Sequence, residues 1–186
     1  MLQGFFLPFF TILVAEMLDK SQLAIVALSG KTKNYLALFL GSMLAFILVD
    51  GAAIVFGAIV AELVPQNLVS LFAGLVFIFF GVLSLRPEKE SDTKKIKKSS
   101  VFVSAFLLIF LSEWADKTQL AAAAFASYLN PVLVFLGTIS ALAILTLLAI
   151  FVGSKLTKYI KRELLQKITG ALFLLIGAFL LFSALS

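Results

Sequence analysis

The sequence contains no cysteine and no histidine, and it has one tryptophan and four prolines in 186 residues. Without cysteine the chain can form no disulfide and has no thiol chemistry, and without histidine no imidazole can bind a metal ion. It also lacks a nucleophile–base pair, a phosphate-binding loop and a cofactor signature. We therefore expect a protein that is not an enzyme and that carries no prosthetic group.

Apolar residues, by contrast, are abundant. They make up 62% of the chain, twenty residues are phenylalanine, and the mean hydropathy is +1.13. Apolar runs near the ~18 residues typical of a membrane-spanning helix recur from end to end. The sequence therefore predicts an all-α integral membrane protein with six transmembrane helices. The expected spans are residues 4–29, 35–61, 67–85, 101–127, 131–153 and 167–185.

Two short stretches of the chain are almost alike: AEMLDKSQLA at residues 15–24 and SEWADKTQLA at residues 112–121. They lie 97 residues apart, and several glycines recur 96 residues later in the second half. These glycine pairs are Gly41 and Gly137, Gly57 and Gly153, Gly74 and Gly170, and Gly81 and Gly177. The pattern indicates a duplicated three-helix unit. Because three is odd, the second copy must enter the membrane from the opposite side, which gives inverted repeats.

The chain accordingly divides into a first repeat at residues 1–85, a charged linker at 86–100 and a second repeat at 101–186. Outside the two motifs, every lysine and arginine follows span one, three or five. This bias predicts that those loops are cytoplasmic and that both termini are external. A short chain without targeting extensions is typical of the prokaryotic cytoplasmic membrane. The net charge of +5 suits contact with anionic lipid headgroups, and nothing favours nucleic-acid binding.

The two motifs bring ionisable groups into apolar spans, where each charge costs about 2.5–3.5 kcal/mol. We expect these groups to face one another across a shared site, because inverted repeats bring corresponding midpoints to a common axis. Within each span, regular helix would carry the acids and the lysine on roughly one face. The expected cation ligands are Glu16, Asp19, Glu113 and Asp116, with Lys20, Ser21, Gln22, Lys117, Thr118 and Gln119 in support.

Four carboxylates and two ammonium groups leave a net charge of −2, which one divalent cation or two protons would balance. Carboxylate, hydroxyl and amide oxygens are hard donors, which suit Ca²⁺, Mn²⁺ or Mg²⁺ better than zinc, copper or nickel. Protons and a cation would compete for the same carboxylates, so proton-coupled exchange is the expected chemistry. An alternative is that the polar groups only hold helices together, with Glu16–Lys20 and Glu113–Lys117 as ion pairs within a helix.

Asp50 lies in the middle of the second span and breaks the symmetry, because Thr146 stands 96 residues later. Two interpretations remain open for it. It could be an extra ligand or proton carrier, or a structural acid that is protonated or paired with a lysine. The two glutamines are equally open, as ligands or as partners in hydrogen bonds between helices.

The motifs resemble the duplicated E-x-G-D-[KR]-[ST] signature of the Gdt family, which includes Golgi calcium and manganese transporters and bacterial manganese exporters. The resemblance covers essentially the whole chain, and "DKSQLA" and "DKTQLA" are its most specific parts. It implies that the four motif acids bind the transported Mn²⁺ or Ca²⁺ and exchange protons. The family glycine is replaced by Leu18 and Ala115 here, and a bulkier residue at this position would narrow the ion pathway.

Two rival functions stay open at this point. One is an exporter of a small cationic organic solute such as an amino acid, and the other is a membrane scaffold subunit that transports nothing. Four acids favour a dehydrated divalent ion, because a cationic amino acid needs fewer counter-charges and an anchor for its own carboxylate. The sequence leaves open the physiological ion, the direction of transport, the coupling ratio and whether the protein forms a homo-oligomer.

Overall fold

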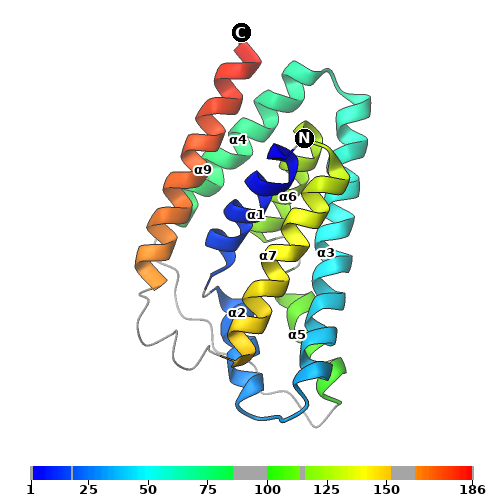
Figure 1. Ribbon diagram of the computed structural model, residues 1–186. Helices are drawn as coiled ribbons and strands as arrows, with labels where there is room; N and C mark the ends of the chain where they lie inside the picture. Colours follow the sequence, from blue (N-terminus) through cyan, green and yellow to red (C-terminus); the bar gives the residue numbers. More distant parts are fainter. Residues whose placement is uncertain (1, 18, 86–99, 114–115, 152–161, 186) are drawn as a thin grey trace.

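A computed structural model describes residues 2–17, 19–85, 100–113, 116–151 and 162–185, and all secondary structure in these ranges is helical (Figure 1). The predicted linker at 86–100 lies almost entirely outside the described residues, as do Leu18 and Ala115. The helices are α1 (Gln3–Glu16), α2 (Lys20–Ser29), α3 (Tyr35–Leu63), α4 (Gln66–Ser84), α5 (Val101–Glu113), α6 (Lys117–Tyr128), α7 (Pro131–Phe151) and α9 (Arg162–Leu185).

Two of these helices, α3 and α7, are long and apolar enough to cross a membrane, with mean hydropathies of 2.5 and 2.6 over their most apolar windows. Four shorter apolar stretches are Gln3–Glu16, Asn67–Leu83, Val101–Glu113 and Gly170–Ala184. Large apolar side chains such as Phe56 and Phe72 point outward and are more than 60% exposed. An all-helical body with an apolar exterior is what a lipid environment requires, because lipid offers no hydrogen bonds to the backbone.

The spans expected at 4–29 and 101–127 are each interrupted, so the prediction of one continuous helix through each motif is wrong. In the first, α1 ends at Glu16 and α2 begins at Lys20, and in the second, α5 ends at Glu113 and α6 begins at Lys117. Two prolines fall at helix starts, where they disturb the helix least: Pro65 immediately precedes α4, and Pro131 is the first residue of α7. Pro8 lies inside α1, which membrane helices tolerate better than soluble ones.

The two halves are packed into each other rather than side by side. Helix α3 packs on α5 and α6 of the second half, and α7 packs on α1 and α2 of the first half. Glycines allow these helices to approach one another closely. A Cβ atom at Gly41 would collide with the backbone carbonyl of Phe102, and one at Gly137 would collide with that of Phe5. These two contacts are equivalent under the repeat. Each long helix therefore covers the interrupted helix of the opposite half.

Helices α4 and α9 pack against each other along a seam of glycines. Gly74 meets the backbone of Gly177, and Gly81 meets that of Gly170, with carbonyl oxygens only about 3 Å from the positions that Cβ atoms would occupy. On the inner side of this seam Phe77 lies 5.5 Å from Phe173 and 4.9 Å from Phe125, measured between ring centroids. The seam is thus anchored to α6 and to the core.

The chain ends and the connections separate to opposite ends of the bundle (Figure 1). The start of α1 and the end of α9 lie toward one end, together with the α3–α4 and α6–α7 connections. The α2–α3 turn, which contains Lys31 and Lys33, lies at the other end. The interruptions between α1 and α2 and between α5 and α6 fall between these ends, so both motifs are in the interior of the bundle.

Candidate cation-binding site

The first interruption places Glu16 and Asp19 on either side of an extended residue. Helix α1 ends at Glu16, Met17 is extended with ψ of 120°, and Asp19 is the N-cap of α2 with ψ of 172°. The Asp19 carboxylate accepts a hydrogen bond from the backbone N–H of Lys20 at 2.7 Å. Aspartate is a preferred N-cap, and its charge is favourable at the positive end of a helix dipole. The break therefore has a local cause in the sequence.

The second interruption has an equivalent hydrogen bond and an equivalent N-cap residue. The N–H of Asp116 donates to the carbonyl of Glu113 at 3.2 Å, as the N–H of Asp19 does to the carbonyl of Glu16 at 3.1 Å. Asp116 is likewise the N-cap residue of α6, with ψ of 165°. Interrupted helices with polar groups at the break are the usual place where membrane transporters bind ions. In both motifs, therefore, the second helix of the pair begins directly after the aspartate.

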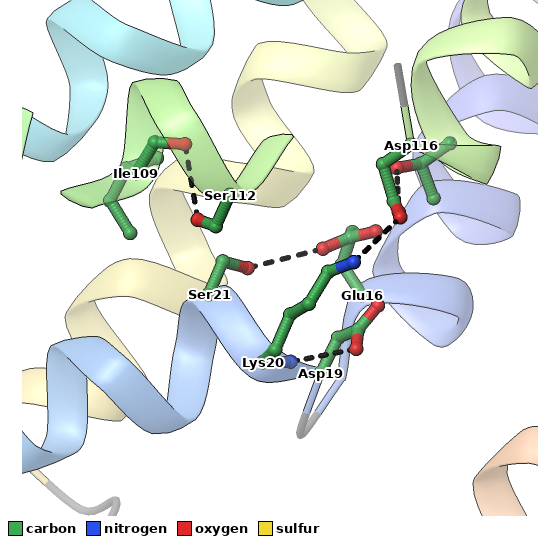
Figure 2. A network of polar contacts seen from close by, with 8 residues as sticks. Glu16, Asp19, Lys20, Ser21, Ile109, Ser112 and Asp116 are labelled. Atoms are coloured by element: carbon green, nitrogen blue, oxygen red, sulfur yellow. Dashed lines mark hydrogen bonds and ion pairs between the residues drawn. The ribbon is translucent and has the colours of Figure 1, made fainter. Parts of the chain in front are cut away.

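Three carboxylates meet between the two interruptions (Figure 2). Glu16, Asp19 and Asp116 each offer an oxygen within 4.8 Å of the others, and the first two are at least 95% buried. We call these residues the acidic trio. It takes two members from the first motif and one from the second, so the structure brings the two motifs together.

Lys20 reaches across this meeting point. Its ammonium group lies 3.0 Å from the carboxylate of Asp116, and the two side chains are 39% and 14% exposed (Figure 2). Among the described residues this pair joins the two halves of the chain, and it differs from the Glu16–Lys20 pair within one helix that regular helix geometry would give. The lysine therefore acts on the acid of the opposite motif. Lys117 begins α6, and its side chain lies outside the described part of the structure.

Ser21 connects the fourth motif acid to the trio. Its hydroxyl donates to Glu16 at 3.3 Å and is also within hydrogen-bonding reach of Glu113. Glu113 is 3% exposed at the end of α5, and it interacts electrostatically with Asp19 and Asp116. It is nevertheless not a member of the group within 4.8 Å. The four expected ligands therefore lie in one region, but only three of them form the group within 4.8 Å and Glu113 lies outside it.

The remaining motif residues divide into paired and unpaired groups. Gln119 donates from its amide nitrogen to the backbone carbonyl of Val49 on α3 at 3.2 Å. Gln22, its counterpart, is 3% exposed, and neither of its amide atoms has a hydrogen-bond partner among the described residues. Thr118 is buried and donates to Asp116 at 3.4 Å. The two glutamines therefore differ in role, although the sequence makes them equivalent.

Asp50 lies in the buried face of α3 and is 3% exposed. It interacts electrostatically with Asp116 and with Glu113. The described residues give its Oδ2 atom no hydrogen-bond partner. Asp50 therefore belongs to the same region as the motif acids, although it lies on another helix.

Sequence analysis missed three buried hydroxyls on the long helices. Ser42 on α3 and Thr138 and Thr146 on α7 are completely buried, and none has a hydrogen-bond partner within the described ranges. Comparing the halves at an offset of 96 residues would have found the first two, because Ser42 and Thr138 correspond. The same comparison pairs Thr146 with Asp50, a substitution that places a neutral hydroxyl where the other half has a carboxylate.

The chemistry of the trio is that of an oxygen-only cation site. Its donors among the described residues are carboxylates, with serine and threonine hydroxyls beside them, and the chain has neither histidine nor cysteine to add an imidazole or a thiolate. Such donors suit hard divalent cations. Burial strengthens the electrostatic attraction between these carboxylates and any cation that loses its water to bind them.

The family model for the divalent cation/proton antiporter GDT1 matches residues 4–92 and 101–186. The chain belongs to the GDT1 family. It is therefore a member of a family of membrane transporters and not an enzyme, as the motifs and the apolar composition predicted.

Relatives of this GDT1 chain come from plants and bacteria. The chloroplastic PAM71-homolog of Arabidopsis thaliana is 28% identical over 94% of the chain, which spans 58% of that protein's length. GDT1-like protein 3 of Oryza sativa is 27% identical over 88% of the chain and 68% of its own length. A Vibrio cholerae protein named as a candidate manganese exporter is 26% identical over 90% of the chain and 84% of its own length. No solved structure matches the chain.

Proposed function

We propose that this protein is a secondary transporter that exchanges Mn²⁺ or Ca²⁺ for protons, with the transported ion bound in mid-membrane by the acidic trio and by Glu113. The observation that carries the proposal is that the trio takes ligands from both motifs. An ion held between two halves of a chain can be released to either side when the halves move relative to each other, as alternating access requires.

The trio supports proton exchange through simple competition. Its carboxylates bind either a divalent cation or protons, and in a buried site the two cannot be held together without excess positive charge. The ammonium group of Lys20 already contacts Asp116, so it must be displaced or must share that carboxylate when a cation binds. Cation binding is thereby linked to a change in contacts between the halves.

The architecture in the membrane is a finer proposal: six spans arranged as two inverted three-helix repeats. The first and fourth spans would each consist of a helix pair, α1 with α2 and α5 with α6. The equivalent glycine contacts of α3 on α5 and α7 on α1 support this symmetry. The separation of the chain ends from Lys31 and Lys33 supports external termini and cytoplasmic basic loops (Figure 1).

Mn²⁺ and Ca²⁺ remain the two ions proposed. The Vibrio cholerae relative is named for manganese, which favours Mn²⁺. The donor set itself is compatible with both ions. A cationic amino acid fits less well, since three carboxylate oxygens within 4.8 Å of one another suit a small ion that all three can contact.

The test is ion flux in proteoliposomes that contain the full chain, with Mn²⁺, Ca²⁺ or Mg²⁺ supplied outside under an imposed pH gradient. We expect uptake of Mn²⁺ or Ca²⁺ to depend on the gradient and to move protons in the opposite direction. Asp116→Asn should abolish the flux, whereas Glu62→Gln, a matched change at an exposed acid outside the site, should not. Flux of lysine but of no divalent cation would reject the proposal.

A further inference from the structure

Asp50 is the acid that the duplicated motifs do not explain. It lies on α3, is 97% buried and has one carboxylate oxygen without a hydrogen-bond partner in the described structure. Burying a carboxylate without compensation costs several kcal/mol (about 2.5–3.5 on membrane insertion scales). A residue of this kind needs a partner, and the described residues do not supply one to this oxygen.

The groups that act on Asp50 are also acids. Asp116, at the start of α6, and Glu113, at the end of α5, are the described charges that interact with it. The described cation in this network, Lys20, is paired with Asp116 at 3.0 Å. Since the described residues offer Asp50 and Glu113 no positive charge, a bound cation would make this arrangement favourable.

Glu113 is the acid of the second motif that interacts with Asp50. It is 97% buried, interacts electrostatically with Asp50 and stands outside the trio. The first motif has no such pair, because the residue equivalent to Asp50 is Thr146 on α7, whose buried hydroxyl has no hydrogen-bond partner among the described residues. The buried acids of the described structure thus form the trio and, beside it, the pair of Asp50 and Glu113. No equivalent pair of described residues lies beside the first motif.

We propose that Asp50 and Glu113 form a second binding position for a divalent cation, next to the acidic trio and on the α3 side only. This inference rests on the proposed function, because it adds a position to the same transport site. The carboxylates of the two acids are its charged ligands, and Ser21, which is within reach of Glu113, connects it to Glu16 of the trio.

The charges support two positions. When Lys20 is paired with Asp116, the remaining acids are Glu16 with Asp19 and Glu113 with Asp50. Each of these pairs carries a formal charge of −2, which one divalent cation balances. A single cation in the trio would leave the buried pair uncompensated, and the cost of that charge in a membrane interior favours a second ion.

The experiment counts Mn²⁺ ions bound to the detergent-solubilised full chain by equilibrium dialysis at saturating Mn²⁺. We expect about two ions per wild-type chain and about one in Asp50→Asn, because the variant loses a charged ligand of one position only. Asp19→Asn should also keep about one ion, in this case at the Asp50–Glu113 position. Two Mn²⁺ ions in neighbouring positions should also broaden the paramagnetic resonance spectrum of the wild type, and either variant should lose that broadening.

Two controls keep the result interpretable. Glu62→Gln should bind as the wild type does, and Asp50→Thr, which copies the equivalent residue Thr146 of the second half, should behave as Asp50→Asn does. One ion per chain in both the wild type and Asp50→Asn would overturn the second position and leave the proposed function intact. No binding in the wild type would overturn the proposed function and this inference with it.

Discussion

The two helix interruptions share a backbone hydrogen bond and an aspartate N-cap but have different surroundings. Both begin after a buried glutamate and end at an aspartate N-cap, with equivalent N–H to carbonyl hydrogen bonds. Near Glu113, however, α3 contributes Asp50, whereas the equivalent position on α7 is Thr146. The two interruptions therefore share their hydrogen bond and N-cap residue, but only one of them has an additional carboxylate from the long helix packed on it. The following predictions test how far the halves are equivalent.

The largest effect is expected at the glycines where the halves meet. Gly41→Val and Gly137→Val should each prevent stable folding, because the added side chain would collide with the backbone of Phe102 or Phe5. Overpacking of this kind typically costs about 1–3 kcal/mol, and more where the obstacle is backbone. The yield of monodisperse protein in detergent measures the outcome. Gly51→Val is the control, because its nearest neighbour is the ring of Phe135 at 3.5 Å. Normal yield for one of the two variants and loss for the other would show that the halves pack differently.

The second effect concerns the two aspartates of the trio. Asp19→Asn and Asp116→Asn should each weaken Mn²⁺ binding at the trio by at least about tenfold, or 1.4 kcal/mol, since each removes one charged ligand. The double variant should lose less than the sum of the two, because both residues act on the same ion. Calorimetric titration of the four proteins measures these affinities. Additive losses would mean that the aspartates serve separate ions.

A smaller effect should distinguish the two glutamines. Gln119→Leu should lower the free energy of unfolding by about 1 kcal/mol, because it removes a hydrogen bond between α6 and the carbonyl of Val49 on α3. Gln22→Leu should change it by less than about 0.5 kcal/mol, since its amide has no partner to lose. Thermal unfolding in metal-free detergent compares them. If Gln22→Leu is the more damaging variant, the asymmetry between the glutamines is wrong.

Much of this arrangement could be predicted from the sequence, because two similar motifs and glycines at a constant spacing indicate a duplication. The motif at 15–24 and its near copy at 112–121 predict two repeats, and the matched glycines marked positions where helices approach closely. The sequence also predicted that the chain belongs to this family and that it is not an enzyme, and both predictions are confirmed.

The helix interruptions could not be predicted in the same way. Neither motif contains a proline or a glycine, and Leu18 and Ala115 stand where the family signature has glycine. The available signal was the N-cap preference of aspartate, which is weak beside a long apolar run that favours continuous helix. The contact of Lys20 with Asp116 follows from the break, because in an unbroken helix Lys20 would lie over Glu16.

The glycine seam between α4 and α9 has a consequence for how such a chain can arise. Gly74 meets Gly177 and Gly81 meets Gly170, and the repeat exchanges these two contacts for each other. Each half therefore presents the same patch to its partner, as the subunits of a twofold-symmetric dimer do. A three-helix ancestor that carried this patch could pair with an oppositely oriented copy of itself before any gene fusion. The linker at 86–100 would then have joined two subunits whose interface already existed.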